Sequence, residues 1–124
     1  MLNYIEERRR DFQALCREII VKSTSPLTIE EIINIAIQSA APRYYVGHRM
    51  AMRVIRKMRH GRFNVLNLQR RRQWEEIERK VASWEKRGYS TGQAVSMVLA
   101  GAVASSYFIS ARTAHRILQR NSTL

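Results

Sequence analysis

Residues 28–57, TIEEIINIAIQSAAPRYYVGHRMAMRVIRK, decide the fold, because the same pattern returns further along the chain. At an offset of 63 and without a gap, the stretch aligns with residues 91–120, TGQAVSMVLAGAVASSYFISARTAHRILQR. The matched pairs include Thr28 with Thr91, Ala41 with Ala104, Tyr44 with Tyr107, Arg49 with Arg112, Ala51 with Ala114 and Arg53 with Arg116. Self-similarity of this kind indicates that one structural unit occurs twice.

The match extends toward the N-terminus when the offset is moved to 62. The arginines at 8–10 then align with those at 70–72, and Phe12 aligns with Trp74. One inserted residue separates the two registers. We therefore expect two repeats, residues 1–60 and 61–124.

Inside each repeat the apolar residues recur at helical spacing. The first repeat predicts helices over 2–22, 29–40 and 47–59, with Thr28 and Glu31 at the spacing of a capping box and Pro42 ending the second helix. The second repeat predicts helices over 69–87, 91–103 and 110–120, with Gly88 as a stop. Neither repeat contains an alternating pattern typical of a strand. The expected fold is all-α, with six helices in two duplicated tri-helical units.

The second helix of each repeat is apolar on most sides, particularly AVSMVLAGAVA at 94–104. A helix of this kind is buried between layers, so we expect the two repeats to pack into one compact domain. A homodimer interface on the same helix is the alternative.

Composition favours an anionic partner. The 124 residues include 22 Lys and Arg against 10 Asp and Glu, a formal net charge of +12, and 45% are hydrophobic, so the chain is expected to fold. Such a basic balance is typical of proteins that contact phosphate backbones. The single cysteine, Cys16, excludes an intramolecular disulfide and predicts a core residue in a reducing compartment, the cytoplasm. No secretion signal or membrane span is expected.

Two predicted helices present basic ridges at about 100° per residue. In 47–59 the cations lie opposite Ala51 and Ile55, and in 110–120 they lie opposite Ala114 and Ile117. From Arg43 to Arg72 the chain contains ten Lys or Arg and no carboxylate. We expect this cluster to contact phosphates, with affinity that depends on salt. In the alternative interpretation the cluster keeps a helix surface soluble or pairs with the glutamates at 75, 76 and 78.

The stretch FISARTAHRIL, residues 108–118, resembles the turn and recognition helix of bacterial helix-turn-helix proteins. The residues that carry the resemblance are Ile109, Ser110, Thr113, Ala114, Arg116 and Leu118. Residues 45–55, YVGHRMAMRVI, are a weaker duplicate, with Gly47 in place of Ser. The resemblance implies that Ser110, Ala111, Arg112 and Thr113 lie nearest the bases in a major groove and that Arg116 lies closer to the backbone.

The repeated aromatic pairs, Tyr44 with Tyr45 and Tyr107 with Phe108, are expected to wedge the third helix of a unit against the other two. The alternative is stacking on single-stranded bases beside Arg43.

The function expected from the sequence is nucleic-acid binding, with double-stranded DNA preferred to RNA, in transcription regulation or an accessory role. The expected binding residues are Arg43, Arg49, Arg53, Arg56, Lys57, Ser110, Arg112, Thr113, Arg116 and Arg120. The alternative is a helical adaptor that binds an acidic protein or assembles with itself. Isolated histidines and the absence of a glycine-rich phosphate loop lead us to expect no enzymatic activity, metal, cofactor or small-molecule substrate.

Overall fold

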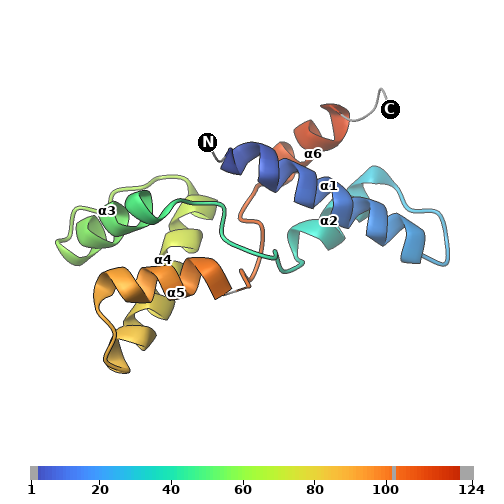
Figure 1. Ribbon diagram of the computed structural model, residues 1–124. Helices are drawn as coiled ribbons and strands as arrows, with labels where there is room; N and C mark the ends of the chain where they lie inside the picture. The colour runs from blue at the N-terminus through green and yellow to red at the C-terminus, as the bar shows by residue number, and fades with distance from the viewer. Residues whose placement is uncertain (1–2, 102, 121–124) are drawn as a thin grey trace. The chain divides into compact units, whose positions relative to one another are not determined.

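The computed structural model describes residues 3–101 and 103–120, and for residue 120 the backbone alone. Over these residues it contains six α-helices and no strand, which confirms the all-α prediction. The helices are α1 (Tyr4–Lys22), α2 (Ile29–Ile37), α3 (His48–Arg59), α4 (Leu68–Lys86), α5 (Thr91–Gly101) and α6 (Ala111–Arg120) (Figure 1). Each helix lies where the periodicity predicted one, with its ends within three residues of the predicted ends.

A capping box fixes the start of α2. The Thr28 hydroxyl oxygen accepts a hydrogen bond from the Glu31 N–H at 3.1 Å, and the Glu31 carboxylate accepts one from the Thr28 N–H at 3.0 Å. The bond from the Thr28 N–H lowers the pKa of the Glu31 carboxyl. The predicted box is thereby confirmed. α2 ends at Ile37, earlier than predicted, where the Ser39 hydroxyl donates to the carbonyl of Ile35 at 2.7 Å and competes with helix continuation.

A second capping box precedes α5. The Ser90 hydroxyl oxygen accepts from the Gln93 N–H at 3.2 Å, and the Gln93 side-chain oxygen accepts from the Ser90 N–H at 3.0 Å. Ser90 therefore has the capping role at α5 that Thr28 has at α2, and the two residues are separated by 62 positions. The predicted alignment pairs Thr28 with Thr91 by residue type. Thr91 instead donates a hydrogen bond to Glu85 at 2.6 Å.

Burial follows the same register through the second helices. Ile33 and Val95 are both fully buried, as are Ala36 and Val98, and each pair is separated by 62 positions. The offset is 63 again at Ala41 and Ala104, which form an isolated antiparallel bridge with N–H···O distances of 3.0 Å in both directions. If the duplication is real, the predicted insertion of one residue falls between Val98 and Ala104.

Glycines in the left-handed region end α3 and α4. Gly61 has φ +70° and Gly88 has φ +100°, a conformation that L side chains adopt at a cost. After α3 the Gly61 N–H donates to the Met58 carbonyl at 3.2 Å, and the Arg62 N–H donates to the Lys57 carbonyl at 2.8 Å. This pair of bonds is the Schellman motif, which satisfies the last carbonyls of the helix.

The helices form two compact units. The first unit consists of residues 1–41 and 104–124 and contains α1, α2 and α6. The second unit consists of residues 42–103 and contains α3, α4 and α5. In the first unit α6, the last helix of the chain, packs on α2 and α1 (Figure 1). In the second unit α3 packs on α5 and α4.

This grouping differs from the sequence repeats 1–60 and 61–124 in one respect. Each repeat contributes its first two helices to one unit and its third helix to the other. Matching a sequence against itself pairs equivalent residues, but it does not show which copy a third helix packs against. The duplication itself stays a prediction.

The core of each unit includes a tyrosine of one of the repeated aromatic pairs. In the first unit the rings of Phe12 and Tyr107 meet edge to face with centroids 5.2 Å apart. Cys16 is buried in the same unit, as predicted, and burial raises the pKa of its thiol to about 11. In the second unit Tyr44 is buried and its hydroxyl donates to Glu76 at 2.5 Å. The burial of both tyrosines agrees with the wedge expected of the aromatic pairs.

Candidate nucleic-acid interface

The positive charge of the chain is concentrated in the second unit. Residues 42–103 contain 14 Lys and Arg and 4 Glu, a formal net charge of +10. The first unit contains 8 Lys and Arg and 6 Asp and Glu, a formal net charge of +2. Because local charge density attracts an anionic polymer, the second unit is the stronger candidate for contact with phosphate groups.

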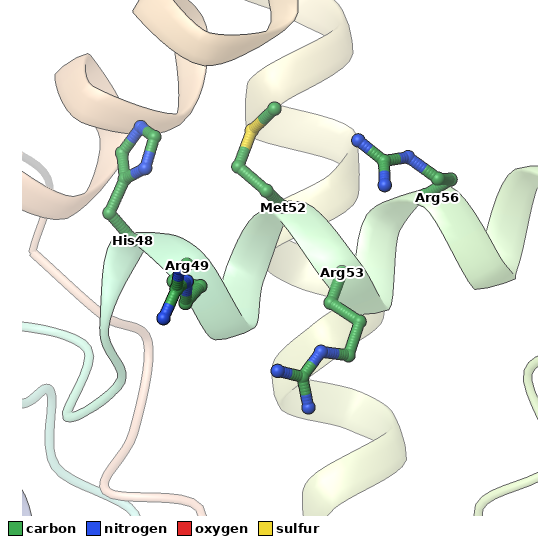
Figure 2. Close-up of a pocket in the computed structure, with 5 residues that line it drawn as sticks. All are labelled: His48, Arg49, Met52, Arg53 and Arg56. Atoms are coloured by element: carbon green, nitrogen blue, oxygen red, sulfur yellow. The ribbon is translucent and has the colours of Figure 1, made fainter.

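Within the second unit α3 carries an exposed basic ridge. Ala51 and Ile55 are fully buried and fix which side of α3 faces the unit. The predicted cations on the other sides are exposed, and they are Arg49, Arg53, Arg56 and Lys57. We call these four residues the α3 ridge. Figure 2 shows Arg49 and Arg53, one turn apart, projecting to the same side of the helix.

Two shallow surface hollows border the α3 ridge. The larger, of about 430 Å³, is lined by His48, Arg49, Met52, Arg53 and Arg56 (Figure 2). The smaller, of about 270 Å³, is lined by Arg53, Arg56, Lys57, His60 and Arg62. Arg53 and Arg56 belong to both, so the basic surface is continuous from the start of α3 to Arg62. At that start the His48 Nε2 lies 3.1 Å from the Gly92 carbonyl oxygen and ties α3 to α5.

Arg59, a further cation of α3, is turned toward α4 instead. Its guanidinium donates to Glu85 at 2.5 Å and to Glu78 at 3.1 Å. The hydrogen bond to Glu85 contributes most to raising the pKa of Arg59. Hydrogen bonds from Arg59 and then Thr91 lower the pKa of Glu85 to about 2. Arg59 therefore holds α3 against α4.

The α3 ridge has no comparable partners. In the part of the chain that the structure describes, no carboxylate lies within ion-pair distance of Arg49, Arg53, Arg56 or Lys57. Of the glutamates expected to neutralise the cluster, Glu78 pairs with Arg59, and Glu76 accepts from Tyr44 and lies 4.0 Å from Lys80. The charge of the ridge is therefore available to an external anion.

Arg43 precedes α3 and lines neither of the two hollows that border the ridge. Its Nε donates to the Tyr44 carbonyl at 3.3 Å, and its guanidinium lies 5.9 Å from the centroid of the Tyr45 ring. The side chains of Arg43 and Tyr45 are half-buried. Their contacts with one another shape the connection before α3.

The candidate residues of α6 belong to the first unit. Arg112 and Arg116 are exposed, and Arg116 lines a hollow of about 180 Å³ together with Arg8, Arg9 and Thr113. The Ser110 hydroxyl oxygen accepts from the Thr113 N–H at 3.1 Å and its hydrogen is donated to the Thr113 hydroxyl oxygen at 3.1 Å. Both hydroxyl groups thus take part in capping α6. The side chain of Arg120 lies outside the described residues.

The helix that resembles a recognition helix, α6, packs on α2 of the other repeat. The helix that precedes it in the chain, α5, belongs to the second unit. α6 and the helix on which it packs most, α2, are therefore not consecutive in the sequence.

The binding residues named from the sequence did not include two sets of basic residues beside the candidate helices. Arg62 borders the same hollow as Lys57, and Arg8 and Arg9 border the hollow of Arg116. The carboxylate-free run from Arg43 to Arg72 includes Arg62, so composition indicated that Arg62 belongs to the basic cluster. Helical periodicity did not indicate its position, because Arg62 follows the last turn of α3.

No protein-family model, curated protein or solved structure compared with the chain matches it. Among residues 3–101 and 103–120, no group of three or more His, Cys, Asp and Glu side chains is placed to hold a metal ion. None of the helices in those ranges has the length and apolar character needed to cross a bilayer.

Proposed function

We propose that the protein binds nucleic acid, preferentially double-stranded DNA, and that α3 is the helix that contacts the duplex. The observation that carries the proposal is the α3 ridge, four exposed cations without carboxylate partners in the described residues, in a unit of formal charge +10. The proposed role is regulatory or accessory, and non-catalytic. The proposed location is the cytoplasm, which is the reducing compartment expected from the single cysteine.

The dimensions of α3 suit a major groove. A helix of 12 residues is about 18 Å long, and the major groove, about 12 Å wide, admits an α-helix. Cations one turn apart reach successive phosphates or base edges along the helix. Each phosphate neutralised releases counterions, so four contacts give a slope of about −3.6 in log K against log salt.

In this proposal α6 is a weaker second contact. Arg112 and Arg116 are exposed, but the first unit has a formal charge of only +2. The carboxylates of the first unit reduce the long-range attraction that Arg112 and Arg116 exert on an anionic polymer. Ser110, which precedes α6, and Thr113 within it have hydroxyl groups for base edges, and these groups are already hydrogen-bonded to one another. We therefore assign most of the affinity to α3.

The test is charge reversal on the ridge. The double variant Arg53→Glu/Arg56→Glu is expected to lose roughly 10- to 100-fold in affinity for a random duplex and to reduce the magnitude of the salt slope by about 2, because two phosphate contacts are lost. Fluorescence anisotropy of a labelled duplex of about 20 base pairs, at two salt concentrations, measures both quantities. A single-stranded oligonucleotide of equal length and an RNA duplex measure the preference for DNA.

The matched control is Arg10→Glu/Arg17→Glu on α1. Both residues are exposed and the change in net charge is identical, but they belong to the first unit. The control is expected to retain most of the affinity. If both double variants bind equally well, or if the ridge variant keeps its salt slope, α3 is not the binding helix.

Self-association or binding of an acidic protein is the second candidate, and an apolar hollow in the first unit favours it. The hollow, of about 310 Å³, is lined by Leu15, Glu18, Ile19, Lys22, Ser23, Leu27 and Ile35. Sedimentation velocity over a range of concentrations, with and without poly-L-glutamate, tests it. A single species of 14.5 kDa throughout would exclude this candidate.

A further inference from the structure

The connection between α3 and α4, residues 60–67, is held at both ends. At its start the Schellman bonds of Gly61 and Arg62 fix the direction in which the chain leaves α3. At its end the Asn67 side chain caps α4 by accepting from the Arg70 N–H at 3.0 Å. The Arg71 guanidinium donates twice to the Val65 carbonyl, at 3.1 and 2.7 Å. Hydrogen bonds therefore hold this segment at both ends, and we call it the α3–α4 loop.

Leu66 stands between the two last anchors and projects into solvent. Its side chain is 89% exposed, more than any other large apolar side chain among those described. The clamp on Val65 and the cap at Asn67 fix the backbone on both sides of it. Single exposed leucines are common on protein surfaces. This one is held outward by hydrogen bonds to both of its neighbours.

The surroundings of Leu66 are cationic. Arg62 lines the hollow that Arg53 and Lys57 also line, so the loop begins on the basic surface of α3. Arg70 and Arg72 are exposed near the start of α4, where the first turn has no acidic residue. Cations at that end of a helix meet the positive end of its dipole, and a bound anion relieves the repulsion.

We propose that the α3–α4 loop is a second contact with the duplex, in which Leu66 enters the minor groove and wedges a base step open while Arg62, Arg70 and Arg72 hold the flanking phosphates. This inference rests on the proposed function and adds a DNA deformation to it. An apolar side chain framed by cations is complementary to a base step, which is apolar between its stacked faces and flanked by anionic phosphates. Leucines used in this way kink a duplex by about 20–90°.

The experiment uses the full chain and duplexes that carry 2-aminopurine at successive positions, together with a second duplex labelled at both ends for energy transfer. The wild-type protein is expected to raise 2-aminopurine fluorescence at one or two adjacent positions at least twofold and to shorten the distance between the ends. Leu66→Ala is expected to lose most of both signals while its affinity falls less than about tenfold. Leu66→Met, which preserves an apolar wedge, is expected to restore them.

The matched control is Val21→Ala on α1, which truncates an apolar side chain that is 83% exposed in the first unit. It is expected to behave as the wild type. Salt-dependent binding without any 2-aminopurine or distance change, or with the same change in Leu66→Ala, overturns the wedge and leaves the proposed function intact. No salt-dependent binding to any duplex overturns the proposed function first. Leu66-dependent binding to phosphatidylserine vesicles, without a signal from DNA, assigns the loop to a membrane surface and also overturns the wedge.

Discussion

At the scale of single residues, Arg59 shows how one position decides whether a cation serves the fold or an external partner. Ala51, Ile55 and Arg59 are spaced by four residues and so share one side of α3. Because the first two are buried, the third is directed toward α4, where Glu78 and Glu85 receive it. The spacing in the sequence indicates that Arg59 faces the unit. The sequence does not indicate its acidic partners, because they lie 19 and 26 residues further along the chain.

The Arg59–Glu85 pair predicts a loss of stability in acid. The pKa of Glu85 is lowered from 4.5 to about 2 in the folded state, chiefly by its hydrogen bond from Arg59. A carboxyl whose folded-state pKa is depressed stabilises the fold above its unfolded-state pKa, and the contribution is lost as pH falls toward the folded-state value. The free energy of unfolding, from urea titrations at several pH values, is expected to decrease between pH 4.5 and about 2.

Glu85→Gln should be less stable than the wild type at neutral pH, and the difference between the two should shrink across the same acid range. Glu75→Gln is the control, since Glu75 is exposed and forms no ion pair with the described residues. If the free energy of unfolding of Glu85→Gln falls in parallel with that of the wild type, the Arg59–Glu85 pair does not cause the loss of stability in acid.

At the scale of helices, the sequence predicted most of what the structure contains, because caps and apolar periodicity are local. The capping box at Thr28, the stop at Gly88 and the buried faces follow from residues within a few positions of one another. The register of the second helices did not follow from residue matching. Ser90 caps α5 although Thr91 matches Thr28 by type, since a cap is defined by its bond to the Gln93 N–H.

The Schellman turn after α3 gives a prediction at this scale. Gly61→Ala is expected to lower the free energy of unfolding by about 1–2 kcal/mol, because φ +70° places the new Cβ against the following carbonyl although no other atom lies within 4 Å. Gly92→Ala is the matched control, also in open space but without a positive φ, within α5. It is expected to be neutral or stabilising by up to about 1 kcal/mol. Equal destabilisation of both variants in urea titrations would contradict the assignment of the turn.

At the scale of the whole molecule, the charge of each unit depends on which third helix it contains. α6 belongs to the unit of α1 and α2, and α3 belongs to the unit of α4 and α5. Divided by the repeats, residues 1–60 have 11 basic and 6 acidic residues, a net charge of +5, and residues 61–124 have 11 and 4, a net charge of +7. Divided by the units, the same chain has net charges of +2 and +10. The sequence identified the basic helices, but the concentration of charge in one unit requires α3 to join α4 and α5. Local pattern does not specify that pairing, since Ala51 and Ala114 suit either unit.

This grouping of the helices predicts which aromatic side chains are in contact. The predicted alignment of the repeats pairs Tyr44 with Tyr107, so a first repeat folded on itself would place Tyr44 against Phe12. The structure places Tyr107 there, with ring centroids 5.2 Å apart. Nuclear Overhauser spectra of the full chain are therefore expected to show cross-peaks between the ring protons of Phe12 and Tyr107, and Tyr107→Leu should remove them and shift the Phe12 resonances. Tyr89→Leu, on an exposed tyrosine of the second unit, should leave the Phe12 resonances unchanged. Cross-peaks from Phe12 to Tyr44 instead would show that the third helices are not exchanged, and the basic charge would then be divided as the repeats divide it.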